Sequence, residues 1–208
     1  MEEKISSFTQ NDYQIVNREV LYQGFFRLVR NHIRHVKFDN TWTVEFTREI
    51  LERPSAVGVI PYDPVLDQVI LIEQFRSGAM ANPESPWLIE VIAGIYQHND
   101  IPAEVIRHEA QEEAGMELLD LYPLYEYFVS PGGSNEHFIL YCGRVDASSA
   151  GGIFGLADEH EDIRAFPLPL DEAIELMREG KIKTAPAIIA LQWLQLNREW
   201  LRQLWQTK

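Results

Sequence analysis

The sequence predicts a mixed α/β domain preceded by a small antiparallel β domain. In the first 55 residues, strand-like runs at 25–38 and 41–51 lie on either side of the turn-forming pair Asp39-Asn40. After Ser55, buried-looking apolar runs are interleaved with helical patterns, as in α/β proteins. We therefore expect an N-terminal β domain at residues 1–55 and a second domain at residues 56–208.

The expected N-terminal hairpin is short of apolar side chains for a core of its own. Its second run alternates around Trp42, Val44 and Phe46, as a half-exposed strand does. Because an isolated hairpin is marginally stable in water, we expect it to pack on the rest of the chain or on a second subunit.

The second domain has five apolar runs and three helical segments. The runs at 56–62, 68–75, 87–94, 125–130 and 137–145 predict strands. Helices are expected at about 102–114, 170–180 and 186–205. The first and last open with Pro102 and Pro186 near the first turn, and the middle one ends at Gly180.

The composition is that of an ordinary soluble globular protein, with 46% hydrophobic and 24% charged residues. No apolar run is long enough to span a membrane, and the first ten residues lack the pattern of a secretion signal, so we expect a cytoplasmic protein. Cys142 is the single cysteine, which excludes an intrachain disulfide and a cysteine metal cluster; its apolar surroundings indicate a buried strand residue.

The negative charge is concentrated in the second domain. Residues 1–55 carry eight basic and eight acidic side chains, so the whole net charge of −14 lies in residues 56–208. Such a surface disfavours binding to nucleic acids. An acidic protein still handles an anionic substrate when divalent cations and a few arginines mediate the contact.

Three glutamates share one face of the helix expected at 102–114. Glu109, Glu112 and Glu113 lie in the last turns before Gly115, where the helix dipole disfavours negative charge. A solvated face is the ordinary interpretation of glutamates on a helix. The alternative is a bound Mg²⁺ ion, which prefers carboxylate oxygen. The residues around the cluster decide between the two.

Residues 94–116, GIYQHNDIPAEVIRHEAQEEAGM, resemble the signature of the Nudix hydrolases, Gly-x5-Glu-x7-Arg-Glu-U-x-Glu-Glu-x-Gly-U, in which U is apolar. Two positions differ. Asp100 replaces the first glutamate, and we expect it to affect the position of the loop. His108 replaces the arginine, and we expect weaker support of the metal-binding glutamates, because imidazole is shorter and only partly charged. The fitting residues are Gly94, Glu109, Ala110, Glu112, Glu113, Gly115 and Met116.

The resemblance implies an α/β/α sandwich with a mixed sheet, in which a strand, a loop and a helix bind Mg²⁺, with Mn²⁺ as the alternative. The cation would bridge the diphosphate of the substrate. Glu109 and Glu113 are the leading metal ligands that it implies. The carbonyl of Ala93 would supply another oxygen, and Glu112 would be a weaker or water-mediated ligand.

Further segments resemble the ADP-ribose pyrophosphatase branch of the family, which hydrolyses ADP-ribose to AMP and ribose 5-phosphate. In that branch the N-terminal domain contributes to a homodimer and to the active site of the neighbouring subunit, which would explain a hairpin without a core. The segments are 22–28, 48–64, 69–76, 130–136, 155–163 and 183–196.

The same likeness implies the remaining site residues. In the acidic loop at 155–163, Glu159 would be the general base and Glu161 an additional metal ligand, with the exchanged roles as the alternative; without the resemblance the loop would be a solvated turn. Arg76 follows an apolar strand and would bind the diphosphate, with a surface ion pair as the alternative. Phe25 would stack on adenine, unless it is simply packed. The other implied substrate contacts are Arg48, Glu49, Arg53, Ser130 and Glu136, of which Ser130 has the alternative role of ending a strand.

Two other functions compete with ADP-ribose hydrolysis. The first is the same reaction on another nucleoside diphosphate sugar, such as GDP-mannose. The second is a nucleotide-sugar sensor without turnover, suggested by the departures at Asp100 and His108. The retained helix glutamates and the acidic loop argue against a sensor.

Overall fold

The computed structural model describes residues 8–206, which form two compact units. The first consists of the described residues up to Pro54 together with Phe128–His137. The second consists of Ser55–Tyr127 and the residues from Phe138 onward. Nothing in the sequence pattern indicated that Phe128–His137 joins the N-terminal strands.

The first unit contains an antiparallel sheet of β1 (Tyr13–Gln23), β2 (Arg27–His35) and β3 (Phe46–Glu52), in that order. A short 3₁₀ turn at Gln10–Asp12 precedes β1. The expected hairpin is therefore present, but its second strand begins at Phe46 rather than at residue 41.

The late start of β3 follows from the turn that precedes it. Asn40 adopts a left-handed conformation with φ of 62°, and the Lys37 N–H donates to the carbonyl of Thr41. Beyond this turn, Val36 and Trp42 form a single isolated bridge. Val44, in the following segment, is 85% exposed, so the alternation around Trp42 and Val44 does not indicate a regular strand there.

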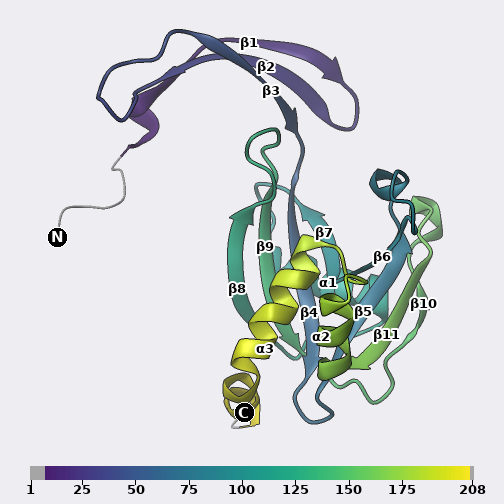
Figure 1. Ribbon diagram of the computed structural model, residues 1–208. Coiled ribbons are helices and arrows are strands. Elements are labelled where there is room, and N and C mark those ends of the chain that lie inside the picture. Colours follow the sequence, from purple (N-terminus) through teal and green to yellow (C-terminus); the bar gives the residue numbers. More distant parts are fainter. Residues whose placement is uncertain (1–7, 207–208) are drawn as a thin grey trace, which may run out of the picture. The chain divides into compact units, whose positions relative to one another are not determined.

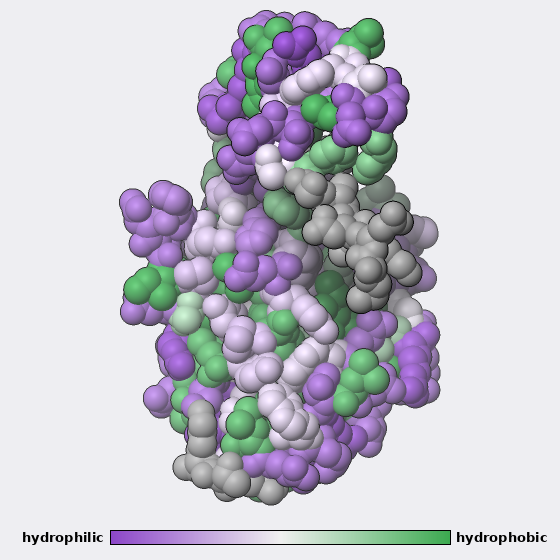
Figure 2. All heavy atoms as spheres, turned by 90° about the vertical axis from the view of Figure 1, so that its left-hand side faces the viewer, coloured by the Kyte–Doolittle hydropathy of each residue, from purple (hydrophilic) through white to green (hydrophobic). Residues whose placement is uncertain are grey.

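The N-terminal sheet has almost no core. Among the described residues up to Pro54, Val29 is the one buried hydrophobic side chain, whereas Tyr22 and Phe25 are 64% and 78% exposed. Figure 2 shows hydrophobic side chains among the hydrophilic ones on this sheet, at the top of the view. The strands of the first unit thus leave apolar surface uncovered.

The second unit is built on an eight-stranded mixed sheet (Figure 1). Its order is β10-β11-β5-β4-β9-β8, with β6 paired to β5 and β7 paired to β4. The central pair β4 and β9 is parallel, and β4 pairs antiparallel with β5 and β7. The strands are β4 (Ser55–Asp63), β5 (Gln68–Phe75), β6 (Trp87–Glu90), β7 (Ile92–Tyr96), β8 (Asp120–Phe128), β9 (His137–Arg144), β10 (Gly152–Phe154) and β11 (Ile163–Pro169).

Helices cover both faces of this sheet, which confirms the expected sandwich. The helices are α1 (Pro102–Ala114), α2 (Leu170–Arg178) and α3 (Ala185–Gln206), close to the predicted ranges. Along β4, Val57 and Val59 share a buried cluster with α1, whereas Ile60 and Tyr62 share another with α2 and α3. Alternate side chains point to opposite faces, so both faces of β4 are buried and its sequence is apolar throughout. No described helix is long and apolar enough to cross a membrane.

The run at 87–94, expected as one strand, is divided between two. Strands β4 and β5 pair only at Tyr62–Val69 and Asp63–Gln68. Farther along, β6 pairs with β5 and β7 pairs with β4. The division at Val91 thus depends on where two other strands cease to pair, which a local pattern does not show.

Helix α3 offers a matched pair of leucines for testing the packing. Leu191 is fully buried, and Leu196 is 84% exposed. We expect Leu191→Ala to lower the free energy of unfolding by about 2–5 kcal/mol through lost burial and a cavity. Leu196→Ala should change it by about 0.5 kcal/mol or less. Urea unfolding measures both, and equal losses would contradict the packing of α3 on the sheet.

Candidate functional site

Helix α1 ends in a turn that places its glutamates at the sheet. Gly115 adopts φ of 63°, a left-handed conformation that glycine takes without strain. Its N–H donates to the carbonyl of Gln111, and the N–H of Met116 donates to the carbonyl of Ala110, both at 3.0 Å. The bond from Gly115 to Gln111 is that of the αL C-cap motif. It ends the helix at Ala114, one residue after Glu113, and the following Met116 is buried in the core.

Glu113 is buried against strand β7. It is 3% exposed, and its carboxylate accepts the N–H of Ala93 at 3.1 Å. Glu109 and Glu112, on the same side of α1, are half-buried. Ala93 therefore lies beside Glu113, and the contact is made by its N–H, whereas the resemblance implied its carbonyl as a metal ligand.

Gly94 permits the approach of Glu109 to the same strand. A Cβ atom at position 94 would overlap the Glu109 carboxylate. Any side chain there would displace Glu109 from its place. Gly94 and Glu109, which are both positions of the signature, are thus in direct contact in the structure.

The glutamates disfavour one another's negative charge. Burial, the largest cause, raises the pKa of Glu113 to about 8; the charges of Glu109 and Glu161 act in the same direction. The Ala93 N–H and the Arg76 guanidinium partly oppose this rise.

The pKa of Glu109 is raised for the same reasons. Burial and then the charges of Glu112, Glu161 and Glu159 raise its pKa to about 7, against a smaller opposing effect of His108. The structure therefore brings the helix glutamates and the acidic loop within electrostatic reach of one another. Among residues 8–206, however, no three acidic, histidine or cysteine side chains converge closely enough to hold one metal ion as they stand.

The acidic loop is attached to α1 through its backbone. The Gly155 N–H donates to the carbonyl of Glu112 at 3.3 Å, and the Leu156 N–H donates to the Glu161 carboxylate at 3.2 Å. Gly155 has φ of 104° and leaves no room for a Cβ atom beside Glu161. Glu161 is half-buried, whereas Glu159, at the end of a 3₁₀ turn, is exposed. The two glutamates thus have different surroundings.

Arg76 stands immediately after β5. Its Nε donates to Glu90 at 2.8 Å, which is the ion pair weighed as the alternative to diphosphate binding. The Arg76 side chain nevertheless stays 45% exposed, and its charge acts on Glu113. The ion pair orients the guanidinium without enclosing it.

The contacts of His108 and Asp100 show how the two departures from the signature fit into the structure. The His108 side chain is 84% exposed, and its Nδ1 lies 3.7 Å from Glu112, so it does not reproduce the fork of an arginine between the glutamates. Asp100 accepts the Gln97 N–H at 2.7 Å and closes the loop before α1, in keeping with a role in loop position. Arg107 donates to the carbonyl of Leu118 and does not replace the missing arginine.

The expected substrate contacts other than Arg76 all belong to the first unit. Phe25 and Arg53 line one cavity of about 280 Å³, which the sequence did not reveal. Arg48 lies over the ring of Phe46, and Glu49 is paired with Arg30. The other residues that line the cavity are Arg27, Glu52, Pro54 and Asn135.

The loop at 130–136 contributes two of the expected residues. Glu136 is paired with Arg53 at 3.3 Å. The carbonyl of Ser130 accepts the N–H groups of Gly133 and Ser134 and so closes a turn, in keeping with its alternative role at the end of a strand. Asn135 was missed, although it lies inside the segment that carried the resemblance.

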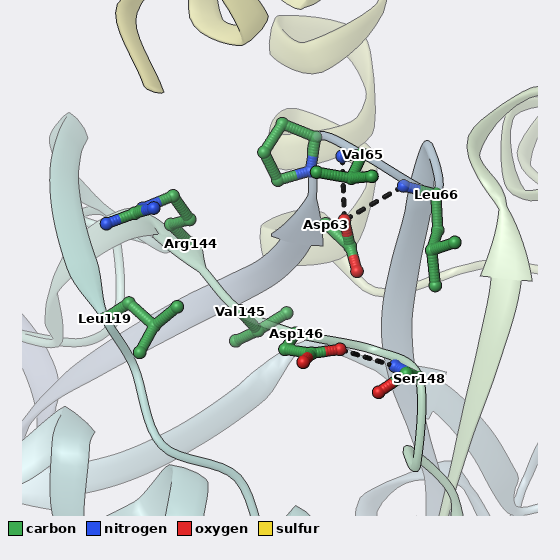
Figure 3. Close-up of a pocket in the computed structure, with 9 residues that line it drawn as sticks. Asp63, Val65, Leu66, Leu119, Arg144, Val145, Asp146 and Ser148 are labelled. Carbon is green, nitrogen blue, oxygen red and sulfur yellow. Dashed lines mark hydrogen bonds between the residues drawn. The ribbon is translucent and has the colours of Figure 1, made fainter. Parts of the chain in front are cut away.

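A second cavity, of about 310 Å³, lies where β4 and β9 end (Figure 3). Asp63 there accepts the N–H groups of Val65 and Leu66, and Asp146 accepts the N–H of Ser148. These carboxylates serve the local turns, and none of the expected site residues lines this cavity. We do not assign a ligand to it.

Comparison with known proteins identifies the family. The Nudix domain model matches residues 52–189. The chain is 44% identical over 199 residues to the ADP-ribose pyrophosphatase of Escherichia coli K12, covering 96% of this chain and 95% of the relative. It is 43% identical over 206 residues to that of Haemophilus influenzae, covering 98% and 95%.

More distant relatives carry other names. The GDP-mannose pyrophosphatase of Enterobacter sp. 638 is 32% identical over 190 residues, covering 88% of this chain and 95% of the relative. A crystal structure of an ADP compounds hydrolase superposes with a TM-score of 0.69 at 22% identity, covering 95% and 98% of the two chains, which shows a common fold. The chain belongs to the Nudix family, and it is a Nudix hydrolase.

The raised pKa values predict a pH-dependent effect of Mg²⁺. Above their ordinary pKa of 4.5, Glu109 and Glu113 lose their protons in the unfolded chain but keep them in the fold up to about pH 7 and 8. Their contribution to stability is therefore lost as the pH rises through that range. Added Mg²⁺ should raise Tm strongly at pH 8.5 and little at pH 5.5. Thermal unfolding with and without EDTA measures this, with the Glu109→Gln/Glu113→Gln double variant as control. Equal shifts at both pH values would contradict it.

Proposed function

We propose that the protein hydrolyses the diphosphate bond of ADP-ribose to AMP and ribose 5-phosphate with the help of a divalent cation. The carboxylate cluster of Glu109, Glu112 and Glu113 at the end of α1 carries this proposal, because a bound cation would offset the burial and the mutual repulsion that raise the pKa values of Glu109 and Glu113. The near full-length likeness to ADP-ribose pyrophosphatases supports the choice of substrate. Both lines support the broader reaction, hydrolysis of nucleoside diphosphate sugars.

The donor set suits a hard divalent cation, for which we propose Mg²⁺, with Mn²⁺ as the alternative. Glu109 and Glu113 would be the principal ligands, helped by the Ala93 carbonyl, Glu112 and Glu161. The ion would draw these side chains closer together, because no three of them converge on one point within residues 8–206. Once bound, it would neutralise the diphosphate and polarise phosphorus.

The protein's own groups would position the water and the substrate. Glu159, exposed on its loop, would accept the proton of the water that attacks phosphorus, as the bond to the bridging oxygen breaks. Glu161, half-buried and bonded to the Leu156 N–H, would bind the metal. The exchanged assignment remains the alternative. Arg76, held by Glu90 but still exposed, would donate to the diphosphate.

The first unit would bind the nucleotide end of the substrate. Phe25 is exposed beside the cavity that Arg53 also lines, so its ring is accessible to adenine. We propose that a homodimer covers the apolar side chains of the N-terminal sheet and shares its active sites between subunits. Arg48, Glu49, Ser130 and Glu136 complete the proposed substrate contacts.

GDP-mannose is the second candidate substrate, because GDP-mannose pyrophosphatases are 31–32% identical to most of the chain. The third candidate is a sensor that binds nucleotide sugars without turnover, suggested by the departures from the signature at Asp100 and at the exposed His108.

A panel of nucleotide sugars distinguishes these functions. The purified protein is incubated with Mg²⁺ and each compound, and phosphate is measured after phosphatase treatment. We expect release from ADP-ribose to exceed that from GDP-mannose, because identity to the former group of pyrophosphatases is higher. The reverse preference would favour the second candidate, and binding without release would favour the sensor.

Glu113→Gln tests the cluster itself. The amide has nearly the same shape as the carboxylate but carries no charge, so we expect an unchanged fold and a kcat lower by about two orders of magnitude or more. Steady-state kinetics with ADP-ribose and circular dichroism measure the two effects. Wild-type turnover in this variant would remove Glu113 from the metal site.

A further inference from the structure

The loop at 130–136 continues the hydrogen-bond pattern of a sheet at the end of β3. Leu51 forms a parallel bridge with Ser134. The Leu51 N–H donates to the carbonyl of Gly133 at 2.8 Å, and the Asn135 N–H donates to the carbonyl of Leu51 at 3.3 Å. These are two successive rungs of a parallel ladder.

The next rung is made by a side chain. A regular ladder would continue from the Arg53 N–H to the backbone carbonyl of Asn135. Here the Arg53 N–H donates to the side-chain Oδ1 of Asn135 at 2.9 Å. Because a backbone N–H only donates, this bond requires the amide oxygen of Asn135 to face Arg53. Asn135 therefore fixes the backbone of Arg53.

The same loop also holds the other end of Arg53. The guanidinium Nη2 is 3.3 Å from the Glu136 carboxylate, and its central carbon lies 5.1 Å from the centre of the Phe26 ring. Asn135 and Glu136, neighbours in the sequence, thus hold the backbone and the charged group of one arginine.

Arg53 has a buried donor without a partner. Its Nε is buried and has no hydrogen-bond partner within residues 8–206. A buried donor without an acceptor is unfavourable, so such a group is usually satisfied by an unseen partner. Arg53, Asn135 and the exposed Phe25 line the same cavity of about 280 Å³, which offers room for a ligand with an acceptor.

We propose that Asn135 is a positioning residue, which holds Arg53 so that its guanidinium binds an acceptor oxygen or ring nitrogen of the nucleotide. This inference rests on the proposed function, in which the substrate is a nucleoside diphosphate sugar. It differs from a purely structural role, in which the bond from Arg53 to Asn135 only fastens the loop.

Two substitutions at Asn135 test whether its side-chain oxygen is needed for substrate binding. Asn135→Ala removes the acceptor, and we expect KM for ADP-ribose to rise about tenfold, the effect of one lost hydrogen bond, with kcat within about twofold. Asn135→Asp keeps an oxygen at the same distance and should restore KM to within about threefold of the wild type. Gly132→Ala is the control in the same loop, since a Cβ there meets no atom within 4 Å.

A double-mutant cycle tests whether Asn135 acts through Arg53. Arg53→Lys keeps the backbone N–H but removes Nε, and it should raise KM on its own. If Asn135 acts by positioning Arg53, adding Asn135→Ala to Arg53→Lys should raise KM by much less than tenfold. Full additivity of the two effects would overturn the proposal.

Calorimetric titration with ADP-ribose in EDTA gives Kd without turnover, and thermal unfolding of each variant reports on the fold. Binding that weakens in Asn135→Ala and recovers in Asn135→Asp supports the positioning role. This holds even if the wild type does not hydrolyse ADP-ribose, because a lack of hydrolysis would overturn only the proposed function. Unchanged Kd in Asn135→Ala, equal weakening in both variants, or no binding by the wild type would overturn the positioning role.

Discussion

The approach of helix α1 to strand β7 is the constraint on which the site depends. It is possible because Gly94 carries no side chain where the Glu109 carboxylate lies and because the Ala93 N–H bonds to Glu113. The apolar residues of β4 hold the helix there, since Val57 and Val59 share a buried cluster with α1. Without this packing the carboxylates would stand in solvent, and burial would not raise their pKa values.

The burial that fixes these carboxylates also makes them unstable as anions. Their raised pKa values express one conflict, because the packing of α1 removes water from these carboxylates and exposes them to the charges of one another and of the acidic loop. In the proposed function, a cation held by these carboxylates would relieve the conflict and would neutralise the diphosphate of the substrate. In this proposal, the binding of a cation and the pH dependence of the free energy of unfolding would both arise from the same carboxylates. The exposed His108 does little to offset this conflict, because its imidazole lies toward solvent.

The two units differ in the kind of surface that they leave unsatisfied. The second has a complete core on both faces of its sheet, and it carries the acidic cluster. The first has apolar side chains without a core, and it carries an arginine with a buried, unused donor.

The sequence by itself determined the helices, most of the strands and the family. Periodicity, Pro102 and the glycine after α1 act within a few residues, and the spaced signature records contacts between a strand and the next helix. Tertiary structure alone decided the division of the run at 87–94, because it depends on where β4 and β5 diverge. It also decided the pairing of Arg53 with Asn135, which lie 82 positions apart. Such pairings depend on the path of the whole chain, and local sequence carries no record of it.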